Sequence, residues 1–396
     1  MKSLSQLLLA AALGYIPACA AVTISTNGLS NVTIGKSTGG GSICASGYVT
    51  IPISVTGTKL DYVPPTSAAG VTQSLVELFQ VTDSLANTIT GTQLISGSYQ
   101  IYVKLCIPSS ASKAASVKTV QLLTHGATLD HNYWDIVTGY SYIDAATEAG
   151  YATLSYDQLG VGNSAHPDPI QVVQANSQVA VTHALAQLLR NAKIGNYSFE
   201  NVVGVGHSAG SSLTQAVTTQ YPSDFDAAIL TGTSTNDNYV SLSMAAFNLI
   251  NANSDSSGRF SSLAAGYLTQ QTSVGIQFAF YSYPNFNTAA FNSQVANKQT
   301  NTLGVLLTLG GIVASAPEFT GPVDVILGEN DFVFCGGNCS YPENQAALVL
   351  STFYPSASSG SQTYLASGSG HAIAAHDSAS ASFTQMIDFL QSNDIY

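Results

Sequence analysis

From about residue 117, short apolar segments alternate with longer segments in which apolar residues recur every three or four positions. The short segments are predicted to be buried strands, at 117–126, 151–160, 199–208, 225–234, 322–331 and 362–371. The longer segments are predicted to be helices, at 172–192, 209–221 and 378–393. Strands joined by helices of this length pair in parallel. The pattern therefore predicts an α/β fold, with a mostly parallel sheet covered by helices on both faces.

One long segment interrupts this alternation. About 90 residues separate the strand at 227–232 from the strand at 323–327, far more than a simple crossover needs. The segment shows no strand rhythm, so it is predicted to form a mostly helical cap, residues 236–317, over the carboxyl edge of the sheet. It divides the α/β core into residues 117–235 and 318–396. An insertion elsewhere on the surface is the alternative.

Residues 21–116 precede the core and form a β-rich leader joined to it. Its segments at 48–55 and 97–108 alternate in polarity and carry β-branched or aromatic residues, which predicts strands. The sequence does not fix whether these strands extend the main sheet.

The first 20 residues have the features of a secretory signal peptide. After a positive start, residues 7–16 form an apolar core too short to span a bilayer, and residues 18–20 form a cleavage site of small side chains. Cleavage is expected near Ala20 or Ala21, which predicts a secreted, extracellular protein. A bacterial lipoprotein signal, with the lipid on Cys19, is the alternative. No later apolar run reaches membrane-spanning length.

The charge balance excludes one class of partner. The chain has 22 acidic and 10 basic residues and a formal net charge of −12, so it offers no basic footprint for nucleic acid. Sequons that would accept N-linked glycans begin at Asn31, Asn196 and Asn338.

Removal of the signal peptide leaves four cysteines, and an even number in an exported chain favours disulfides. Of the three pairings, Cys44–Cys106 with Cys335–Cys339 is preferred, because the second pair is close in sequence. A metal site is the competing interpretation, although no histidine lies near these cysteines at the spacing of a zinc finger.

Ser208 is the candidate nucleophile. It lies in Gly206-His207-Ser208-Ala209-Gly210, between a predicted buried strand and a predicted helix. A tight turn there would project the hydroxyl above the sheet edge, and it requires small flanking residues. The alternative is a structural serine at the start of a helix.

A serine hydroxyl needs a base to become nucleophilic at neutral pH. Two histidines follow Ser208 in the chain, His371 and His376. His371 lies in the loop after the last predicted strand and is the preferred base. His376 is expected to be a neighbour or a surface residue.

The base needs an orienting acid from a loop after an intervening strand. Asp331 is the last residue of the segment 322–331 and lies past the apolar residues of the strand. It is preferred, with Glu329 in reserve. Asp324 is disfavoured, because a carboxylate within a buried strand is costly. Asp237, after the preceding strand, is a further alternative.

Acyl transfer also needs two backbone donors for the developing oxyanion. The amide of Ala209, next to the nucleophile, is predicted to be one. The second is predicted to be Ala127 in the loop after the first core strand, with Gly126 as the alternative. His125 in that loop is expected to organise the turn.

Together these motifs resemble the α/β-hydrolase superfamily over residues 117–392. The motifs are His125-Gly126, "SYDQLGVGNS" at 155–164, "GHSAG" at 206–210, "GENDF" at 328–332 and "GSGH" at 368–371. The segment from "IYVKLCIP" to "LLTHGATLDHNYWD" resembles secreted fungal members. The resemblance implies hydrolysis of an ester, thioester, lactone or amide through an acyl-enzyme, with no cofactor or metal. It also implies that the loop from Asp157 to Ser164 is structural.

The substrate is expected to be a small molecule, an apolar ester or lactone. Aromatic residues in the predicted cap could line its pocket or form the cap's own core, and they are Phe278, Phe280, Tyr281, Tyr283 and Phe286. Alternative functions are an aminopeptidase resembling the proline iminopeptidases, a biosynthetic acyltransferase, and a noncatalytic binding protein of the same fold.

Overall fold

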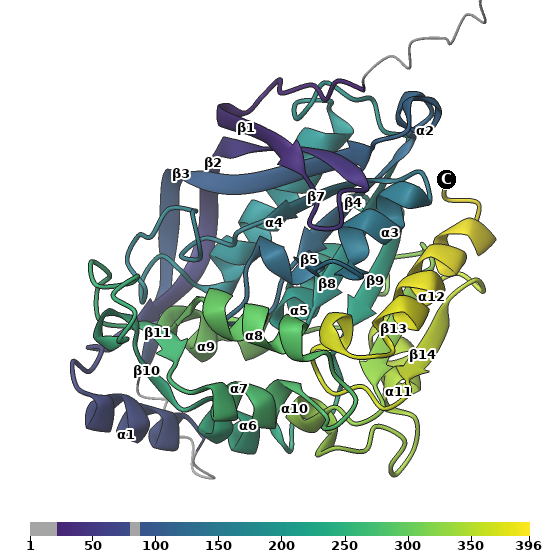
Figure 1. The fold of residues 1–396 in the computed structure, drawn as a ribbon. Helices are drawn as coiled ribbons and strands as arrows, with labels where there is room; N and C mark the ends of the chain where they lie inside the picture. Colours follow the sequence, from purple (N-terminus) through teal and green to yellow (C-terminus); the bar gives the residue numbers. More distant parts are fainter. Residues whose placement is uncertain (1–21, 80–87) are drawn as a thin grey trace, which may run out of the picture.

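A computed structural model describes residues 22–79 and 88–396. The predicted signal peptide lies outside the described residues. Within them, nine strands form one central sheet, in the order β1-β2-β3-β7-β4-β8-β9-β13-β14 (Figure 1). Their bounds are β1 Ser30–Lys36, β2 Ser42–Leu60, β3 Ile89–Pro108, β4 Thr119–Thr124, β7 Ala152–Tyr156, β8 Asn201–His207, β9 Ala227–Thr231, β13 Val323–Gly328 and β14 Gln362–Ala366.

The strands from β7 to β14 pair in parallel, as the alternation of strands and helices predicts. Strands β1, β2 and β3 pair antiparallel, and β3 joins the edge of β7. The leader strands therefore extend the main sheet, which the sequence left open. In Figure 1 the strands β1, β2 and β3 run along the purple and dark-blue side of the molecule.

Helices cover both faces of the sheet. The helices outside the cap are α1 Ala68–Leu78, α2 Ala111–Ala115, α3 Tyr142–Glu148, α4 Ala175–Arg190, α5 Ala209–Gln220, α10 Phe332–Cys335, α11 Gln345–Phe353 and α12 Ala379–Ser392. Buried side chains of α4, α5 and α11 form one hydrophobic core against the sheet, and those of α3 and α12 form a second. In α4, Val181, Leu185 and Leu189 make a fully buried stripe at helical spacing.

Short elements complete the loops around the core. They are η1 His131–Trp134, β5 Asp135–Val137, β6 Tyr140–Ser141 and η4 Ile373–Ala375.

The predicted cap region contains helices and also a small sheet. Its helices are α6 Val240–Phe247, α7 Ser273–Phe280, α8 Thr288–Asn297 and α9 Leu303–Thr308, with short turns η2 Ala252–Ser254 and η3 Leu309–Ile312. An antiparallel sheet of β10 Leu249–Asn251, β11 Tyr267–Gln270 and β12 Thr300–Thr302 lies among them. The sequence did not predict this sheet, because strands of three or four residues are too short to show a period of two.

The four described cysteines lie in two pairs at disulfide distance. The sulfur atoms of Cys44 and Cys106 are 2.05 Å apart, and those of Cys335 and Cys339 are 2.10 Å apart. This is the preferred pairing. Cys44 and Cys106 face each other directly across β2 and β3, so the bond crosslinks two adjacent strands.

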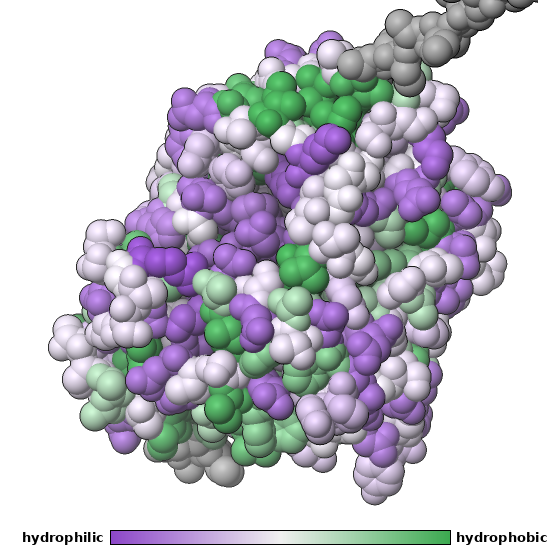
Figure 2. All heavy atoms as spheres, in the orientation of Figure 1, coloured by the Kyte–Doolittle hydropathy of each residue, from purple (hydrophilic) through white to green (hydrophobic). Residues whose placement is uncertain are grey.

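The surface mixes hydrophilic and hydrophobic residues, with a hydrophobic patch over β1, where Val32 and Ile34 are exposed (Figure 2). The sequon residues Asn31, Asn196 and Asn338 are all exposed. Within residues 22–79 and 88–396, no helix has the length and apolar character needed to cross a membrane.

Candidate active site

Ser208 lies on a sharp turn between β8 and α5. Its φ of 56° and ψ of −124° are a strained combination for a residue with a side chain. The turn is fixed from the next strand, because the Ser208 amide donates to the Thr231 carbonyl at 2.9 Å. The Ser211 hydroxyl donates to the same carbonyl at 2.8 Å. This geometry presents a half-buried hydroxyl at the carboxyl end of the sheet.

The flanking glycines are required by close backbone contacts. A Cβ at Gly206 would lie 2.5 Å from the Gly210 carbonyl oxygen, and a Cβ at Gly210 would lie 2.2 Å from the Thr124 carbonyl oxygen. The helix α5 therefore packs directly onto β4 and β8 at the turn, which explains why the sequence has glycine on both sides of Ser208.

His371 and Asp331 form a buried pair beside this turn. The His371 Nδ1 atom and Asp331 Oδ2 are 2.7 Å apart, and both side chains are almost completely buried. The other ring nitrogen, His371 Nε2, has no hydrogen-bond partner among the described residues. Because Nδ1–H donates to the carboxylate, Nε2 carries the lone pair. This is the arrangement that a general base needs.

Several contacts place His371 next to the serine turn. Its ring lies 5.0 Å from the ring of His207, the residue before Ser208. A Cβ at Gly232, directly after Thr231, would lie 3.2 Å from His371 Cε1. Among the described residues, the Ser208 hydroxyl makes no hydrogen bond to Nε2. Such bonds are often loose before substrate binds.

His207 is held in its neutral form, with a proton on one ring nitrogen and not on both. Burial, and then the proximity of His371, lower the pKa of His207 well below its usual value. Its ring stacks on Tyr133 at 4.2 Å, and Nδ1 lies 3.1 Å from the Thr231 hydroxyl. His207 is therefore a neutral packing partner of the site, and it adds no positive charge beside His371.

The alternative acids occupy other positions. Glu329 accepts hydrogen bonds from the Ser367 hydroxyl and the Gly368 amide, so it holds the loop after β14. Asp324 is fully buried in β13, and burial raises its pKa to about 8, so it is neutral at pH 7. Asp237 is exposed after β9. Among these acids, Asp331 is the one in contact with His371.

His376 is buried beside the loop of His371, so of the two expected alternatives it is the neighbour and not the surface residue. Its Nε2 accepts from the amides of Ser282 and Gly370, each at 3.0 Å, and its Nδ1 donates to the Ala372 carbonyl at 2.8 Å. Burial lowers the pKa of His376 to about 4. Both nitrogens are hydrogen-bonded to backbone groups, so the ring is not available as a base. Through these bonds the ring links the loop of His371 to Ser282 in the cap.

Ala127 and Ala209, the predicted oxyanion donors, line the same cavity as Ser208. The alternative residue, Gly126, approaches the nucleophile closely, since a Cβ there would lie 2.9 Å from Ser208 Cβ. His125 is buried in this loop, and its Nε2 accepts from the Gln158 amide at 3.1 Å. This contact fits the expected role of His125 in organising the turn.

No local sequence pattern predicts the contacts by which residues of the cap hold this loop. Thr128 follows Ala127 and has a φ of 62°, unusual for a β-branched residue. Its hydroxyl lies 2.9 Å from Gln270 Oε1 on β11, and its carbonyl accepts from the Gln299 amide at 2.9 Å. Gln299 Nε2 also donates to Asp130 at 2.8 Å. Cap residues therefore fix the backbone next to the predicted oxyanion donor.

A cavity of about 520 Å³ opens at Ser208. We call it the Ser208 cavity. Its wall is mostly apolar, with Met244, Phe247 and Phe280 from the cap and Val333 and Phe334 from the core. Among the described lining residues none is basic, and Asp237 is the one acidic residue. The cavity therefore suits an uncharged, apolar ligand of the size that enzyme pockets usually bind.

The five aromatic residues of the cap lie in different environments. Phe280 lines the Ser208 cavity and stacks on His371 at 5.3 Å. Tyr281 and Phe286 pack together at 4.9 Å and against the ring of His376. Phe278 is exposed and Tyr283 is 79% exposed, and neither lines the cavity, so these two side chains take neither of the two expected roles. Helix α7 ends at Phe280, and neither Tyr281 nor Tyr283 lines the cavity.

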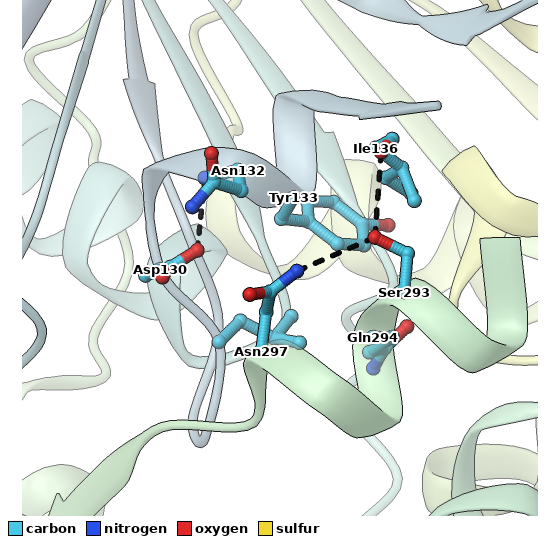
Figure 3. Close-up of a pocket in the computed structure, with 8 residues that line it drawn as sticks. Asp130, Asn132, Tyr133, Ile136, Ser293, Gln294 and Asn297 are labelled. Atoms are coloured by element: carbon cyan, nitrogen blue, oxygen red, sulfur yellow. Dashed lines mark hydrogen bonds between the residues drawn. The ribbon is translucent and has the colours of Figure 1, made fainter. Parts of the chain in front are cut away.

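A second, narrow cavity lies where the loop after Ala127 meets α8 (Figure 3). Ser293 donates to the Ile136 carbonyl at 3.4 Å and accepts from Asn297 at 3.4 Å. The Asn132 amide donates to Asp130 at 2.9 Å. The volume is only about 20 Å³, so this is a polar seam between cap and core with no room for a substrate.

Asp130, His131 and Asp157 bring possible metal-ligating atoms within 4.8 Å of one another. The protein satisfies these groups itself. His131 Nδ1 lies 2.6 Å from Asp157 Oδ1, and the Asn163 amide donates to Asp157 Oδ2 at 2.8 Å. Burial alone would lower the pKa of His131, but the Asp157 carboxylate raises it overall. The buried contact between His131 and Asp157 secures the loop that begins at Asp157, in keeping with the structural role expected for that loop.

The family of the chain is shown by comparison. The profile described as "Alpha/beta hydrolase family" matches residues 121–383, and the chain belongs to this family. No curated protein sequence matches the chain significantly.

Solved structures show the same fold at low sequence identity. A thermophilic esterase from Thermogutta terrifontis is 14% identical with a TM-score of 0.51, covering 75% of this chain and 94% of the esterase. The esterase EaEST from Exiguobacterium antarcticum is 16% identical with a TM-score of 0.50, covering 74% of this chain and 96% of that one. Both likenesses support the mostly parallel sheet with helices on its two faces.

Proposed function

We propose that the protein is a secreted serine hydrolase that cleaves an uncharged, apolar ester or lactone. The observation that carries the proposal is the buried His371–Asp331 pair, whose free Nε2 lies beside the strained turn of Ser208. The esterases with a similar fold are consistent with this activity. The disulfide-distance cysteine pairs, the predicted signal peptide and the resemblance to secreted fungal hydrolases support secretion.

In the proposed reaction, His371 Nε2 takes the proton of the Ser208 hydroxyl as Oγ attacks the ester carbonyl. The amides of Ala127 and Ala209 donate to the oxyanion that forms. The bond to the leaving oxygen breaks as His371 returns the proton, which releases the alcohol and leaves an acyl-enzyme. Water then attacks the acyl carbonyl as His371 takes its proton. The bond between the acyl carbon and Ser208 Oγ breaks, His371 returns the proton to Oγ, and the acid is released. Asp331 orients His371 and stabilises its protonated form.

The proposal is tested with purified protein and a fluorophosphonate probe. Wild-type protein should be labelled at Ser208 and should hydrolyse a short-chain p-nitrophenyl ester. Ser208→Ala should lose both properties. Ser223→Ala is the matched control, because Ser223 is exposed beyond the end of α5. A folded wild-type sample that is neither labelled nor active on the ester would favour a noncatalytic binding protein.

One observation favours a second candidate, an aminopeptidase. Asp237 is the one acidic residue among the described lining residues of the Ser208 cavity, and an acidic group can bind the free amine of a peptide. An aminopeptidase should cleave an amino-acid p-nitroanilide with a free amine and spare its N-acetylated form. Asp237→Asn should abolish that preference. Equal rates on both forms would reject this candidate.

A further inference from the structure

Helix α5 forms one side of the Ser208 cavity. Ser208, Ser212 and Gln215 all line it, and their spacing of four and three residues places them on one face of the helix. At a rise of 1.5 Å per residue, Gln215 lies about 10 Å along the helix from the nucleophile. The cavity therefore extends away from the reacting hydroxyl along two turns of α5.

Apolar side chains from the end of the cap and from α11 also line this cavity. They are Leu306, Leu309, Val313, Val349 and Phe353. With no basic side chain among the described lining residues, nothing there compensates a carboxylate or phosphate on the ligand. An extended hydrocarbon chain fits this shape and chemistry.

Gln215, the lining residue of α5 farthest from Ser208, carries an unpaired hydrogen-bond acceptor. Gln215 is 3% exposed, and its Nε2 donates to the Ala314 carbonyl and to the Thr219 hydroxyl. These two bonds fix which way the amide faces. Its Oε1 has no partner among the described residues. A buried acceptor without a donor is costly, so a donor on the ligand would complete it.

Ser243 Oγ, also in the cavity lining, has no partner within the described part of the chain either. A serine hydroxyl rotates freely to find a partner, whereas the Gln215 amide is held. Gln215 is therefore the more selective of the two groups.

We propose that the Ser208 cavity binds an extended acyl chain along the first two turns of α5, and that Gln215 Oε1 accepts a hydrogen bond from a hydroxyl group near the end of that chain. This inference rests on the proposed function. A zigzag chain of about eight carbons spans the distance from the acyl carbonyl to Gln215, given carbon–carbon bonds of about 1.5 Å. The substrate class is then an ester or lactone of a hydroxylated aliphatic acid.

The first experiment blocks the cavity at a known distance from Ser208 along α5. Ser212 lies about 6 Å from Ser208 along α5, so Ser212→Phe should block the cavity beyond about four carbons. The ratio of kcat/KM for the p-nitrophenyl octanoate ester to that for the acetate ester should fall at least tenfold. Ser223→Phe, outside the cavity, should keep the wild-type ratio. An unchanged ratio in Ser212→Phe would overturn the placement of the acyl chain.

The second experiment tests the hydroxyl group. Wild-type protein should prefer the 8-hydroxyoctanoate ester over the octanoate ester by about fivefold in kcat/KM, the effect of one hydrogen bond. Gln215→Leu should remove or reverse that preference. Equal rates of wild-type protein on the two esters would overturn the role of Gln215.

Labelling keeps these outcomes separate from failure of the proposed function. Each ratio is measured on protein that the fluorophosphonate still labels at Ser208. Wild-type protein that is folded but not labelled refutes the serine hydrolase itself. Labelled protein with an unaltered chain-length ratio refutes only the acyl-chain site.

Discussion

We predict that His376 makes the native protein sensitive to acid, through a contact that also holds the loop of His371. Its neutral ring accepts the amides of Ser282 and Gly370 and donates to Ala372. Protonation would remove the acceptor and place a charge in a buried site. The pKa is about 4 in the native state, against an ordinary value of 6.5. Between these values the unfolded chain binds a proton that the native state does not.

The sign and size of the effect follow from this difference. The stabilisation from neutral His376 is fully present above pH 6.5 and is lost as the pH falls toward 4. The difference in pKa corresponds to about 3 kcal/mol in the free energy of unfolding. The slope of stability against pH should therefore include nearly one additional proton over this range.

His376→Gln isolates this contribution. The glutamine oxygen can accept the same two amides but cannot be protonated in this range. We expect a loss of about 1–2 kcal/mol at pH 7, because the bond to Ala372 and the stacking on Tyr281 at 5.4 Å are lost. Between pH 6.5 and 4, however, the variant should lose about 3 kcal/mol less than the wild type.

The assay is urea unfolding across this pH range, followed by the fluorescence of Trp134. This is the single tryptophan of the chain, and it is buried near Tyr133. Other histidines titrate in both proteins and cancel in the difference. If the two curves of stability against pH run parallel, the proposed effect of His376 is refuted.

Three further variants have defined outcomes. Asp331→Asn should lower kcat for the ester about 10⁴-fold, because the proposed base loses its orienting carboxylate. The free energy of unfolding, measured with urea, should remain close to that of the wild type. Gln270→Leu should lower kcat about fivefold at constant KM and weaken a trifluoromethyl ketone inhibitor equally, because Thr128 loses a hydrogen bond beside the predicted oxyanion donor. Replacing both Cys44 and Cys106 with alanine should lower the free energy of unfolding by about 4 kcal/mol for a loop of 62 residues, as measured by urea unfolding.

The α/β core could be predicted because its signals are local. Each predicted core strand, such as 199–208 and 322–331, contains an observed strand, and each predicted helix contains an observed helix. A buried parallel strand appears in the sequence as an apolar run, and an amphipathic helix as apolar residues at 3–4 spacing. The pairing of β3 with β7 has no such local signal, because it depends on which edge of the sheet is free.

The candidate site could be predicted in part for the same reason. The glycines beside Ser208 are required by the close packing of the turn, so they mark it in the sequence. Asp331 and His371 lie in loops that follow predicted strands, so their positions could be predicted as well. The role of His376 could not be predicted, because its partners include Ser282, which is 94 residues away. The difference between Phe280 and Tyr283 depends on where α7 ends, and helix ends are weakly encoded.

The contacts between cap and core bear on how the cap can move. Gln299 holds the backbone at Thr128, beside the predicted oxyanion donor, and Ser282 binds His376 in the loop of His371. A rigid displacement of the cap would break both attachments, and it would leave Thr128 in a strained conformation without its partners. Opening to admit substrate is therefore expected to involve a part of the cap that makes neither contact. Helix α6, which carries Met244 into the cavity wall, meets this condition.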